Sequence, residues 1–301
     1  NLSKWCAFKW HAWGGDAAQM KRSYILGNPV DVTAIPTLNE ETRSEVRANM
    51  GIPPGRFIFG RVGRPALSKW HTGIIDAFLS VLSEHDVGLL LVGPPPEIVQ
   101  RIHELPPSTQ LRIKYFPPIH SDKQLFSVVG AMDGFLHLAT QGESFGMVLC
   151  EAMVAGVPVV TLSTPLKDNS QLEVVGHERG GLVALSLDAV PKAMRRLITD
   201  SSFRRAAKAN GRDWVASRFD IDTISKKAMR IYQEVLSNIP ANVNKDEFDE
   251  PPNLAWIHSM LANGIGNPNL RMKSSLMFGL VHNAHVYRTY LTLRPLLRRA
   301  M

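Results

Sequence analysis

The sequence predicts an α/β fold, namely a parallel, Rossmann-like sheet with helices on both faces. Short apolar segments alternate with helix-compatible segments from residue 57 to residue 237, which is the pattern of successive βαβ units. One of these segments, Val87–Val92, is continuously apolar, as expected for a strand buried on both faces. Hydrophobic residues make up 45% and charged residues 20% of the 301 residues, which is typical of a globular protein with a substantial core.

The first elements of the chain are a helix and a short strand. Residues 1–22 place Trp5, Phe8 and Trp13 at helical spacing, which predicts a helix that packs on a neighbouring domain or lies on a membrane surface. Residues 23–26 are apolar enough for a short strand, and the break at Gly27-Asn28-Pro29 ends it.

The strand–helix alternation then follows in order. Asn39 is a candidate cap for a polar helix, and Pro96 is suited to the first turn of a later one. The predicted helices cover residues 39–50, 71–83, 96–104, 122–129, 146–155 and most of 188–237. The predicted strands cover residues 57–62, 87–92, 111–116, 134–138, 157–162 and 182–184.

The C-terminal part has a different composition. Residues 245–252 are acidic and contain proline, which indicates a linker, and residues 254–301 are mostly helix-compatible. The chain ends with Arg294, Arg298 and Arg299 among leucines. This predicts a helical basic tail that either packs back on the protein or contacts a membrane or a partner helix.

Charge and cysteine content limit the class of protein. The net charge of +7 favours anionic partners such as nucleotides, although it is spread along the chain and gives no reason to expect nucleic acid. Cys6 and Cys150 form no disulfide framework, and no apolar run is long enough for a membrane span. We therefore expect a cytoplasmic protein, with peripheral membrane contact as an alternative. The chain begins at Asn1, which is compatible with a fragment.

The loop after the first predicted strand carries two cations. Gly63 permits a close approach by a ligand, Arg64 offers a planar fork for phosphate oxygens, and Lys69 offers a point charge. A diphosphate would fit this pattern, since open parallel sheets bind ligands at the carboxyl ends of their strands. Exposed Arg and Lys on loops are more often simply solvated, so this loop alone is weak evidence.

The loop before residues 146–155 is a second candidate anion site. Glu143 follows a predicted strand, and the free backbone N–H groups of the next helix begin near Gly146. Gly142 and Gly146 would allow a phosphate or a sugar hydroxyl to approach the backbone.

Glu151 is a carboxylate on an otherwise apolar helix. Burying it is costly unless hydrogen bonds satisfy it. Ribose hydroxyls could supply them, and so could a structural bond to Arg64, Lys69 or a backbone amide. The residues alone leave these two interpretations equal.

No metal site is expected. Asp220-Ile221-Asp222 imitates an acidic metal-binding triplet, but it opens a helix, so capping is the better interpretation. The histidines form no pair at metal-ligand spacing on one helix face. His71 and His120 lie near strand ends and are more simply explained as ordinary surface or core residues.

Residues 132–161 closely resemble the C-terminal domain of family-four glycosyltransferases of the GT-B fold. The hallmark is Glu143 and Glu151 with seven residues between them, followed by the segment Ala155-Gly156-Val157-Pro158. The segment from Val62 to Lys69 resembles the phosphate-binding loop of that family, and the similarity extends over roughly residues 22–237.

The resemblance implies a donor site for a nucleotide diphosphate sugar, such as a UDP- or GDP-sugar, and no cofactor. Arg64 and Lys69 would hold the diphosphate, Glu143 would bond the transferring sugar, and Glu151 would bond the ribose. These implied roles make Glu143, Arg64 and Lys69 the candidate catalytic residues of a retaining, metal-independent transfer. The implied donor-binding residues are Gly63, Arg64, Lys69, Ser144, Phe145, Gly146, Met147 and Glu151, with the backbone of residues 144–147 meeting the sugar and phosphates.

The resemblance also divides the chain. Residues 1–30 would be the remnant of an N-terminal acceptor lobe and the hinge, residues 31–240 the nucleotide-sugar-binding domain, and residues 241–301 the linker and the helical basic tail. A GT-B enzyme needs two lobes, so the acceptor lobe would lie elsewhere in the same chain or in another chain. The acceptor, whether a sugar, a lipid or a protein, is left open.

Two departures from the family pattern keep other functions open. Trp70 follows Lys69 where the family usually has glycine, and residues 163–171 lack the usual glycine-rich form. The first alternative is a non-catalytic module that binds a nucleotide sugar or a partner lobe. The second is a related GT-B enzyme that epimerises or hydrolyses a sugar nucleotide, against which the spacing of the two glutamates argues.

Overall fold

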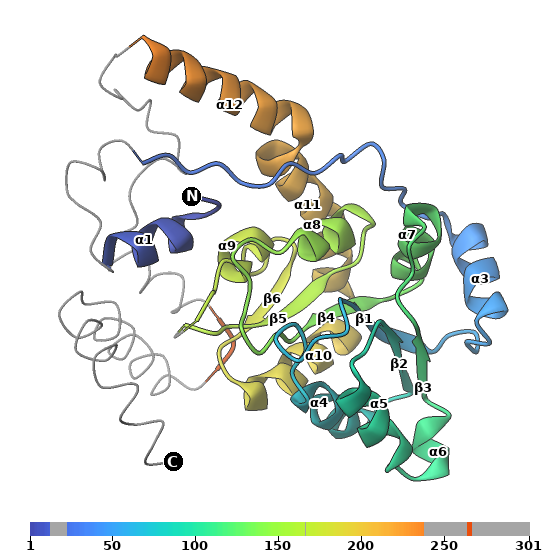
Figure 1. The fold of residues 1–301 in the computed structure, drawn as a ribbon. Coiled ribbons are helices and arrows are strands. Elements are labelled where there is room, and N and C mark those ends of the chain that lie inside the picture. Colours follow the sequence, from blue (N-terminus) through green and yellow to red (C-terminus); the bar gives the residue numbers. More distant parts are fainter. Residues whose placement is uncertain (13–22, 166, 238–263, 267–301) are drawn as a thin grey trace, which may run out of the picture.

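The computed structural model describes residues 1–12, 23–165, 167–237 and 264–266. Its centre is a six-stranded parallel sheet of order β3-β2-β1-β4-β5-β6 (Figure 1). The strands are β1 (Phe57–Val62), β2 (Val87–Val92), β3 (Ile113–Phe116), β4 (Gly134–His137), β5 (Val159–Leu162) and β6 (Gly181–Ala184). The predicted Rossmann-like α/β fold is confirmed.

Helices cover both faces of this sheet (Figure 1). One face packs on α4 (Gly73–Leu82), α5 (Pro96–His103) and α10 (Val190–Thr199). The other packs on α7 (Asp122–Gly130), α8 (Met147–Val154), α9 (Gln171–Val175) and α11 (Ser201–Phe219). The remaining helical elements are α1 (Lys4–Ala12), α3 (Glu40–Asn49), α6 (Pro107–Gln110), the 3-10 turn η1 (Leu187–Ala189) and α12 (Ile221–Leu236).

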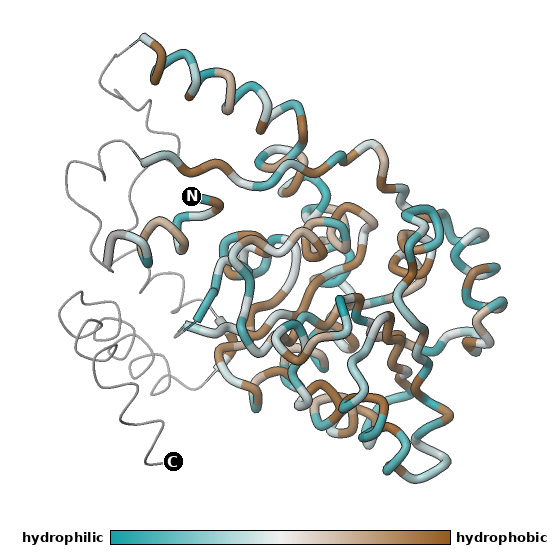
Figure 2. Tube along the Cα trace, viewed as in Figure 1, coloured by the Kyte–Doolittle hydropathy of each residue, from teal (hydrophilic) through white to brown (hydrophobic). Residues whose placement is uncertain are grey.

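The two cores follow from the period-two alternation of each strand. In β2, Leu89 and Leu91 join the core under α4, whereas Leu90 joins the core under α8. Figure 2 shows the hydrophobic residues gathered at the centre and a largely hydrophilic α3, which has no buried residue. A strand buried on both faces must be apolar throughout, which is why the sequence predicted β2 correctly.

Side-chain caps fix several helix starts. The Asn39 side chain accepts a hydrogen bond from Thr42 N at 2.9 Å, as the sequence predicts. Asp220 accepts one from Asp222 N at 3.2 Å at the start of α12. The acidic triplet is therefore a cap, and the interpretation against a metal triplet is confirmed.

The predicted strand at residues 23–26 is wrong. Among the described residues this segment pairs with no strand. It is instead bonded to the first residue: the Asn1 amino group donates to Tyr24 O at 2.8 Å, and Leu26 N donates to Asn1 O at 2.8 Å. Two short helices, α6 and α9, went unpredicted because four and five residues show no periodicity. Since α6 and the turn after it extend to Arg112, β3 begins at Ile113 and not at residue 111.

The first helix is anchored to the domain by a buried carboxylate. Glu173 on α9 accepts hydrogen bonds from Lys4 N at 3.0 Å and Trp5 N at 2.6 Å, which caps α1. The Trp5 side chain is fully buried, and Lys9 forms an ion pair with Asp168 at 2.7 Å. Packing on this domain is thus the confirmed alternative for residues 4–12. The predicted helix beyond residue 12 lies outside the described residues.

Glu173 should make stability depend on pH. Burial, the dominant cause, raises its pKa from 4.5 to about 7, against the opposing hydrogen bonds from Trp5 and Lys4. Because the folded state binds this proton more tightly than the unfolded state, its contribution is fully present below pH 4.5 and is lost as the pH rises through about 7. Urea unfolding should show wild-type stability falling over this window, by up to about 1.4 kcal/mol per pH unit relative to Glu173→Gln. Parallel pH profiles of the two proteins would contradict this.

The chain enters and leaves the sheet domain side by side. Val30 forms a parallel bridge with Asp220, in which Val30 N donates to Phe219 O at 2.8 Å and Ile221 N donates to Val30 O at 3.0 Å. At the other edge, Ile265 bridges to Ala184 at the end of β6. The remainder of the predicted linker and helical tail, residues 241–263 and 267–301, lies outside the described residues. Within the described ranges, no helix has the length and apolarity needed to cross a membrane.

Candidate functional site

The candidate site lies where the strand order reverses. β1 and β4 are neighbours, but the chain runs from β1 outward to β2 and from β4 outward to β5. In such sheets a crevice opens beyond the carboxyl ends of the two central strands. The two loops that follow these strands are held together there: Gln141 N donates to Ser68 O at 3.1 Å, and Thr140 Oγ1 donates to Trp70 O at 2.7 Å.

An ion pair joins the two loops. Lys69 Nζ lies 2.6 Å from Glu143 Oε2, with 30% of the lysine side chain and 10% of the glutamate side chain exposed. The structure therefore brings together two of the three residues predicted to be catalytic. The Glu143 backbone is also fixed, since its N–H donates to Gln171 Oε1 at 3.1 Å.

A buried polar layer lies beneath this ion pair. His137, the last residue of β4, places Nε2 3.1 Å from Glu143 Oε1 and Nδ1 3.2 Å from Thr161 Oγ1. Arg61 of β1 is fully buried, donates to the Lys69 and Leu136 carbonyl oxygens, and stacks on Trp70 at 5.0 Å. Its Nε has no hydrogen-bond partner among the described residues.

This layer fixes the charges of the site. Burial, followed by the charge of Arg61, lowers the pKa of His137 to about 4, so the imidazole is neutral at pH 7. Burial acts to raise the pKa of Glu143, but the hydrogen bonds from His137 and Lys69, together with the charge of Lys69, outweigh it and lower that pKa. Glu143 is consequently ionised. Burial also lowers the pKa of Arg61 to about 10, which leaves the guanidinium charged.

Sequence reasoning missed His137 and Arg61. A signal for both was present, because each is a polar residue inside a short strand whose other members are apolar. A polar residue near the carboxyl end of a buried strand is close to the ligand edge of the sheet, and its partners must come from the loops there.

Arg64 extends from the loop after β1 as an exposed side chain, with no ion pair or side-chain hydrogen bond to the described residues. Its carbonyl oxygen accepts from Trp70 Nε1 at 2.9 Å, which fixes the backbone. Gly63 is half-buried, and its carbonyl oxygen lies where a side chain on Gly93 would be. The guanidinium is thus available to an anion, and its contact with a diphosphate stays a prediction.

The loop before α8 is shaped by two glycines. Gly146 caps the helix with φ 99°, and Gly142 has φ 68°. The helix has no side-chain cap, so its first N–H groups are open to an anion. Of the neighbouring predicted residues, Ser144 is exposed and Met147 is half-buried. Phe145 is buried, with its ring in edge contact with that of Phe219 at 5.0 Å, so only its backbone can meet a ligand.

Gly142→Ala should strongly destabilise the domain. A Cβ at this position would overlap the Asp168 carbonyl oxygen and the Thr164 hydroxyl, in addition to adopting a positive φ. We expect the free energy of unfolding to fall by about 2–5 kcal/mol in urea titrations. Gly55→Ala is the matched control: it has φ 77° with nothing within 4 Å of the added Cβ, and should lose only about 1–2 kcal/mol. Equal losses would mean that the close approach has no cost.

Glu151 is mostly buried on α8 and lacks the structural partners considered from sequence. Its side chain has no hydrogen bond or ion pair with Arg64, Lys69 or any other residue in the part of the chain that the structure describes. Burial raises its pKa, and the charge of Asp122 adds to this effect. The sequence left two interpretations of Glu151 equal, a bond to ribose hydroxyls and a structural bond within the protein. The described residues contain no such structural bond.

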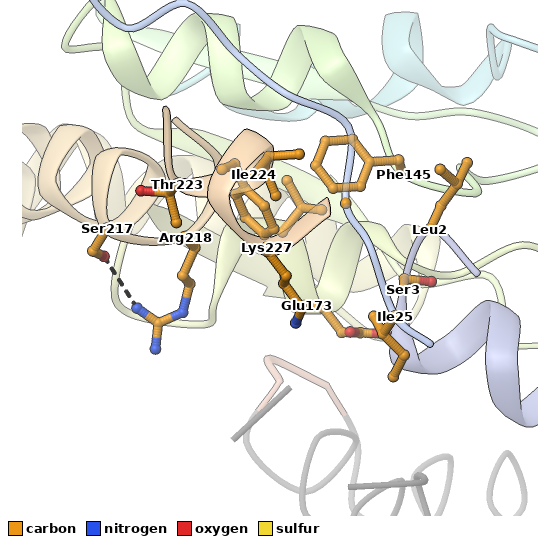
Figure 3. Close-up of a pocket in the computed structure, with 13 residues that line it drawn as sticks. Leu2, Ser3, Ile25, Phe145, Glu173, Ser217, Arg218, Thr223, Ile224 and Lys227 are labelled. Carbon is orange, nitrogen blue, oxygen red and sulfur yellow. Dashed lines mark hydrogen bonds between the residues drawn. The ribbon is translucent and has the colours of Figure 1, made fainter. Parts of the chain in front are cut away.

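A cavity of about 300 Å³ lies between the first residues of the chain, α9 and the junction of α11 with α12 (Figure 3). Its apolar wall includes Ile25, Phe145 and Ile224, and its polar lining includes Glu173 and Arg218. Phe145 connects it to the loop before α8, but neither Lys69 nor Glu143 lines it.

Within the described ranges, no group of three or more His, Cys, Asp or Glu could hold a metal ion, and metal independence stays a prediction.

Comparison with known proteins identifies the domain. Residues 42–214 match the family described as glycosyl transferases group 1. The chain is 29% identical over 198 residues to N-acetyl-alpha-D-glucosaminyl L-malate synthase of Bacillus anthracis, covering 64% of this chain and 49% of that protein. It is 22% identical over 242 residues to D-inositol 3-phosphate glycosyltransferase of Jonesia denitrificans, covering 76% and 54%. The chain thus spans about half the length of these relatives.

Solved structures share the fold. A glycosyltransferase from Rickettsia africae superposes with a TM-score of 0.66 at 19% identity, covering 79% of this chain and 63% of that one. Anabaena HepE, solved with UDP-glucose, gives 0.61 at 23% identity, covering 74% and 59%. The C-terminal domain of a group 1 protein, LpcC of Francisella tularensis, gives 0.55 at 22% identity, covering 64% of this chain and 99% of that domain.

Proposed function

This chain belongs to the glycosyl transferases group 1 family, and we propose that it supplies the donor-binding lobe of a retaining, metal-independent glycosyltransferase. Its substrate is a nucleotide diphosphate sugar, such as a UDP- or GDP-sugar. The observation that carries the proposal is the Lys69–Glu143 pair, which joins the loops after β1 and β4 at the reversal of strand order.

Each part of the donor has a candidate partner. Arg64 and Lys69 hold the diphosphate, assisted by the first N–H groups of α8. Glu143, ionised and held by His137, accepts from hydroxyls of the transferring sugar. Glu151 accepts from the ribose, which supplies the hydrogen bonds that the described residues do not. HepE, solved with UDP-glucose, shares this fold and supports the choice of ligand class.

The two cations would also assist the chemistry. As the bond from sugar to diphosphate breaks, negative charge grows on the leaving phosphate. Arg64 and Lys69, both bound to the diphosphate, would stabilise that charge without a metal. The acceptor would enter from a lobe outside this chain, since the chain spans about half the length of its relatives. The alternative function is that of a module that binds a nucleotide sugar without transferring it.

Thermal shift with UDP, GDP, ADP and their sugar conjugates tests the proposal. A ligand at about a hundred times its Kd adds about 2.7 kcal/mol, which raises the melting temperature by several degrees. We expect a rise with one nucleotide and its sugar conjugate. No rise with any of them would defeat donor binding by this chain. Donor binding without transfer, even after an acceptor lobe is supplied, would favour the binding module.

A further inference from the structure

His137 is fixed on both sides of its ring by groups that determine its hydrogen bonds. Glu143 Oε1, 3.1 Å from Nε2, is a carboxylate oxygen and can only accept. Nε2 therefore carries the proton and donates to Glu143. Nδ1 of the neutral ring is then an acceptor, 3.2 Å from the Thr161 hydroxyl. That hydroxyl also has the His137 carbonyl oxygen as an acceptor at 3.2 Å, so the two acceptors share its one proton.

Burial and the charges around the ring keep it in that state. Burial is the largest cause, and Lys69 and the fully buried Arg61 add to it by opposing a second proton on the imidazole, while Glu143 favours one. Together these effects lower the pKa of His137 to about 4. Among the described residues, Arg61, Glu143 and Lys69 are the charged groups that act on the ring. The imidazole is thus a neutral, single-tautomer donor directed at one oxygen of Glu143.

This arrangement divides the two oxygens of Glu143 between a buried and an accessible partner. Oε1 is bound to His137, which has no exposed surface, whereas Oε2 is bound to Lys69, whose side chain is 30% exposed. An arriving diphosphate can attract Lys69, but nothing in the ligand can reach His137. Glu143 therefore keeps its orientation through Oε1 while Oε2 becomes available.

We propose that His137 is a positioning residue that holds Glu143 toward the sugar of the donor, while Lys69 changes partner from Glu143 to the diphosphate. This inference rests on the proposed function. It predicts that His137 affects recognition of the sugar and leaves recognition of the nucleoside diphosphate unchanged.

The test compares Kd values for a nucleoside diphosphate and for its sugar conjugate, using UDP with UDP-glucose and GDP with GDP-mannose. His137→Leu removes the donor to Glu143 and keeps an apolar strand. We expect the Kd of the conjugate to rise about tenfold, while the Kd of the diphosphate changes less than about twofold. In His137→Gln the side-chain amide can donate in place of Nε2–H, and it should restore most of the preference for the conjugate.

Thr161→Val is the second variant, because it removes the hydroxyl on the other side of the ring while keeping nearly the same shape. It should raise the Kd of the sugar conjugate as well, but by a smaller factor than His137→Leu does. Melting temperatures verify that each variant is folded. The positioning role would be overturned by an equal rise in the Kd of both ligands, by no change in either Kd, or by a failure of His137→Gln to restore the preference for the conjugate. A wild-type protein that binds neither pair would overturn the proposed function itself.

Discussion

Arg64→Ala should weaken binding of the nucleotide diphosphate sugar by about 10- to 100-fold. The exposed guanidinium has no ion pair among the described residues, so the empty protein gains nothing from it that alanine would remove. Its expected value lies in charge-assisted hydrogen bonds to phosphate oxygens, about 1.5–3 kcal/mol. Isothermal titration measures the affinity, and the melting temperature of the ligand-free protein should stay constant.

Arg205→Ala is the matched control for this change. Arg205 is an exposed arginine on α11 with no side-chain hydrogen bond or ion pair to the described residues, and its removal changes the net charge equally. It should leave the affinity within about twofold, because it belongs to neither of the two loops that form the candidate site and its charge is screened by solvent. If both variants weaken donor binding equally, Arg64 contributes only through its charge at long range and does not bind phosphate directly.

Glu151→Ala should weaken donor binding without lowering the stability of the empty protein. The carboxylate is largely desolvated and unpaired within the described residues, so its removal should not lower the free energy of unfolding of the empty protein. The donor should bind about 10- to 100-fold more weakly, because the ribose loses an acceptor for which it has no substitute. Urea titration and calorimetry measure the two quantities on the same sample.

Glu45→Ala on α3 controls for loss of an exposed carboxylate. Glu45 is exposed on a helix that has no buried residue and belongs to neither loop of the candidate site, so neither stability nor affinity should change appreciably. If Glu151→Ala loses stability but keeps full donor affinity, Glu151 has a structural role and does not bind the ribose.

The strands were largely predictable because the sheet is buried on both faces. β1 and β2 begin and end where their apolar runs do. Residues 23–26 show the limit of that signal, since an apolar run indicates burial but not a neighbouring strand, and this one pairs with the first residue of the chain. The short helix α9 was missed for a related reason: it is fixed by tertiary contacts such as Glu173 with α1, which no local pattern contains.

The candidate site was predictable in its parts but not in its connections. Loop residues Arg64, Lys69 and Glu143 were found from their positions after strands, yet nothing local says that Lys69 and Glu143 form an ion pair. The supporting pair, Arg61 and His137, depends on β1 and β4 being neighbours, which strand order alone establishes. A partner for Glu151 remained undecided by sequence because burial on α8 is a property of the packed helix.

The bridge between Val30 and Asp220 has a consequence for engineering. The two ends of the sheet domain lie within backbone hydrogen-bond distance, so the segment between them is topologically a closed loop. A linker of a few residues could join those ends, and new termini could be opened at an exposed turn such as Gly55, giving a circular permutant with the same sheet. Both covalent connections of the sheet domain thus pass through one point, while α1 and Ile265 add contacts to it elsewhere.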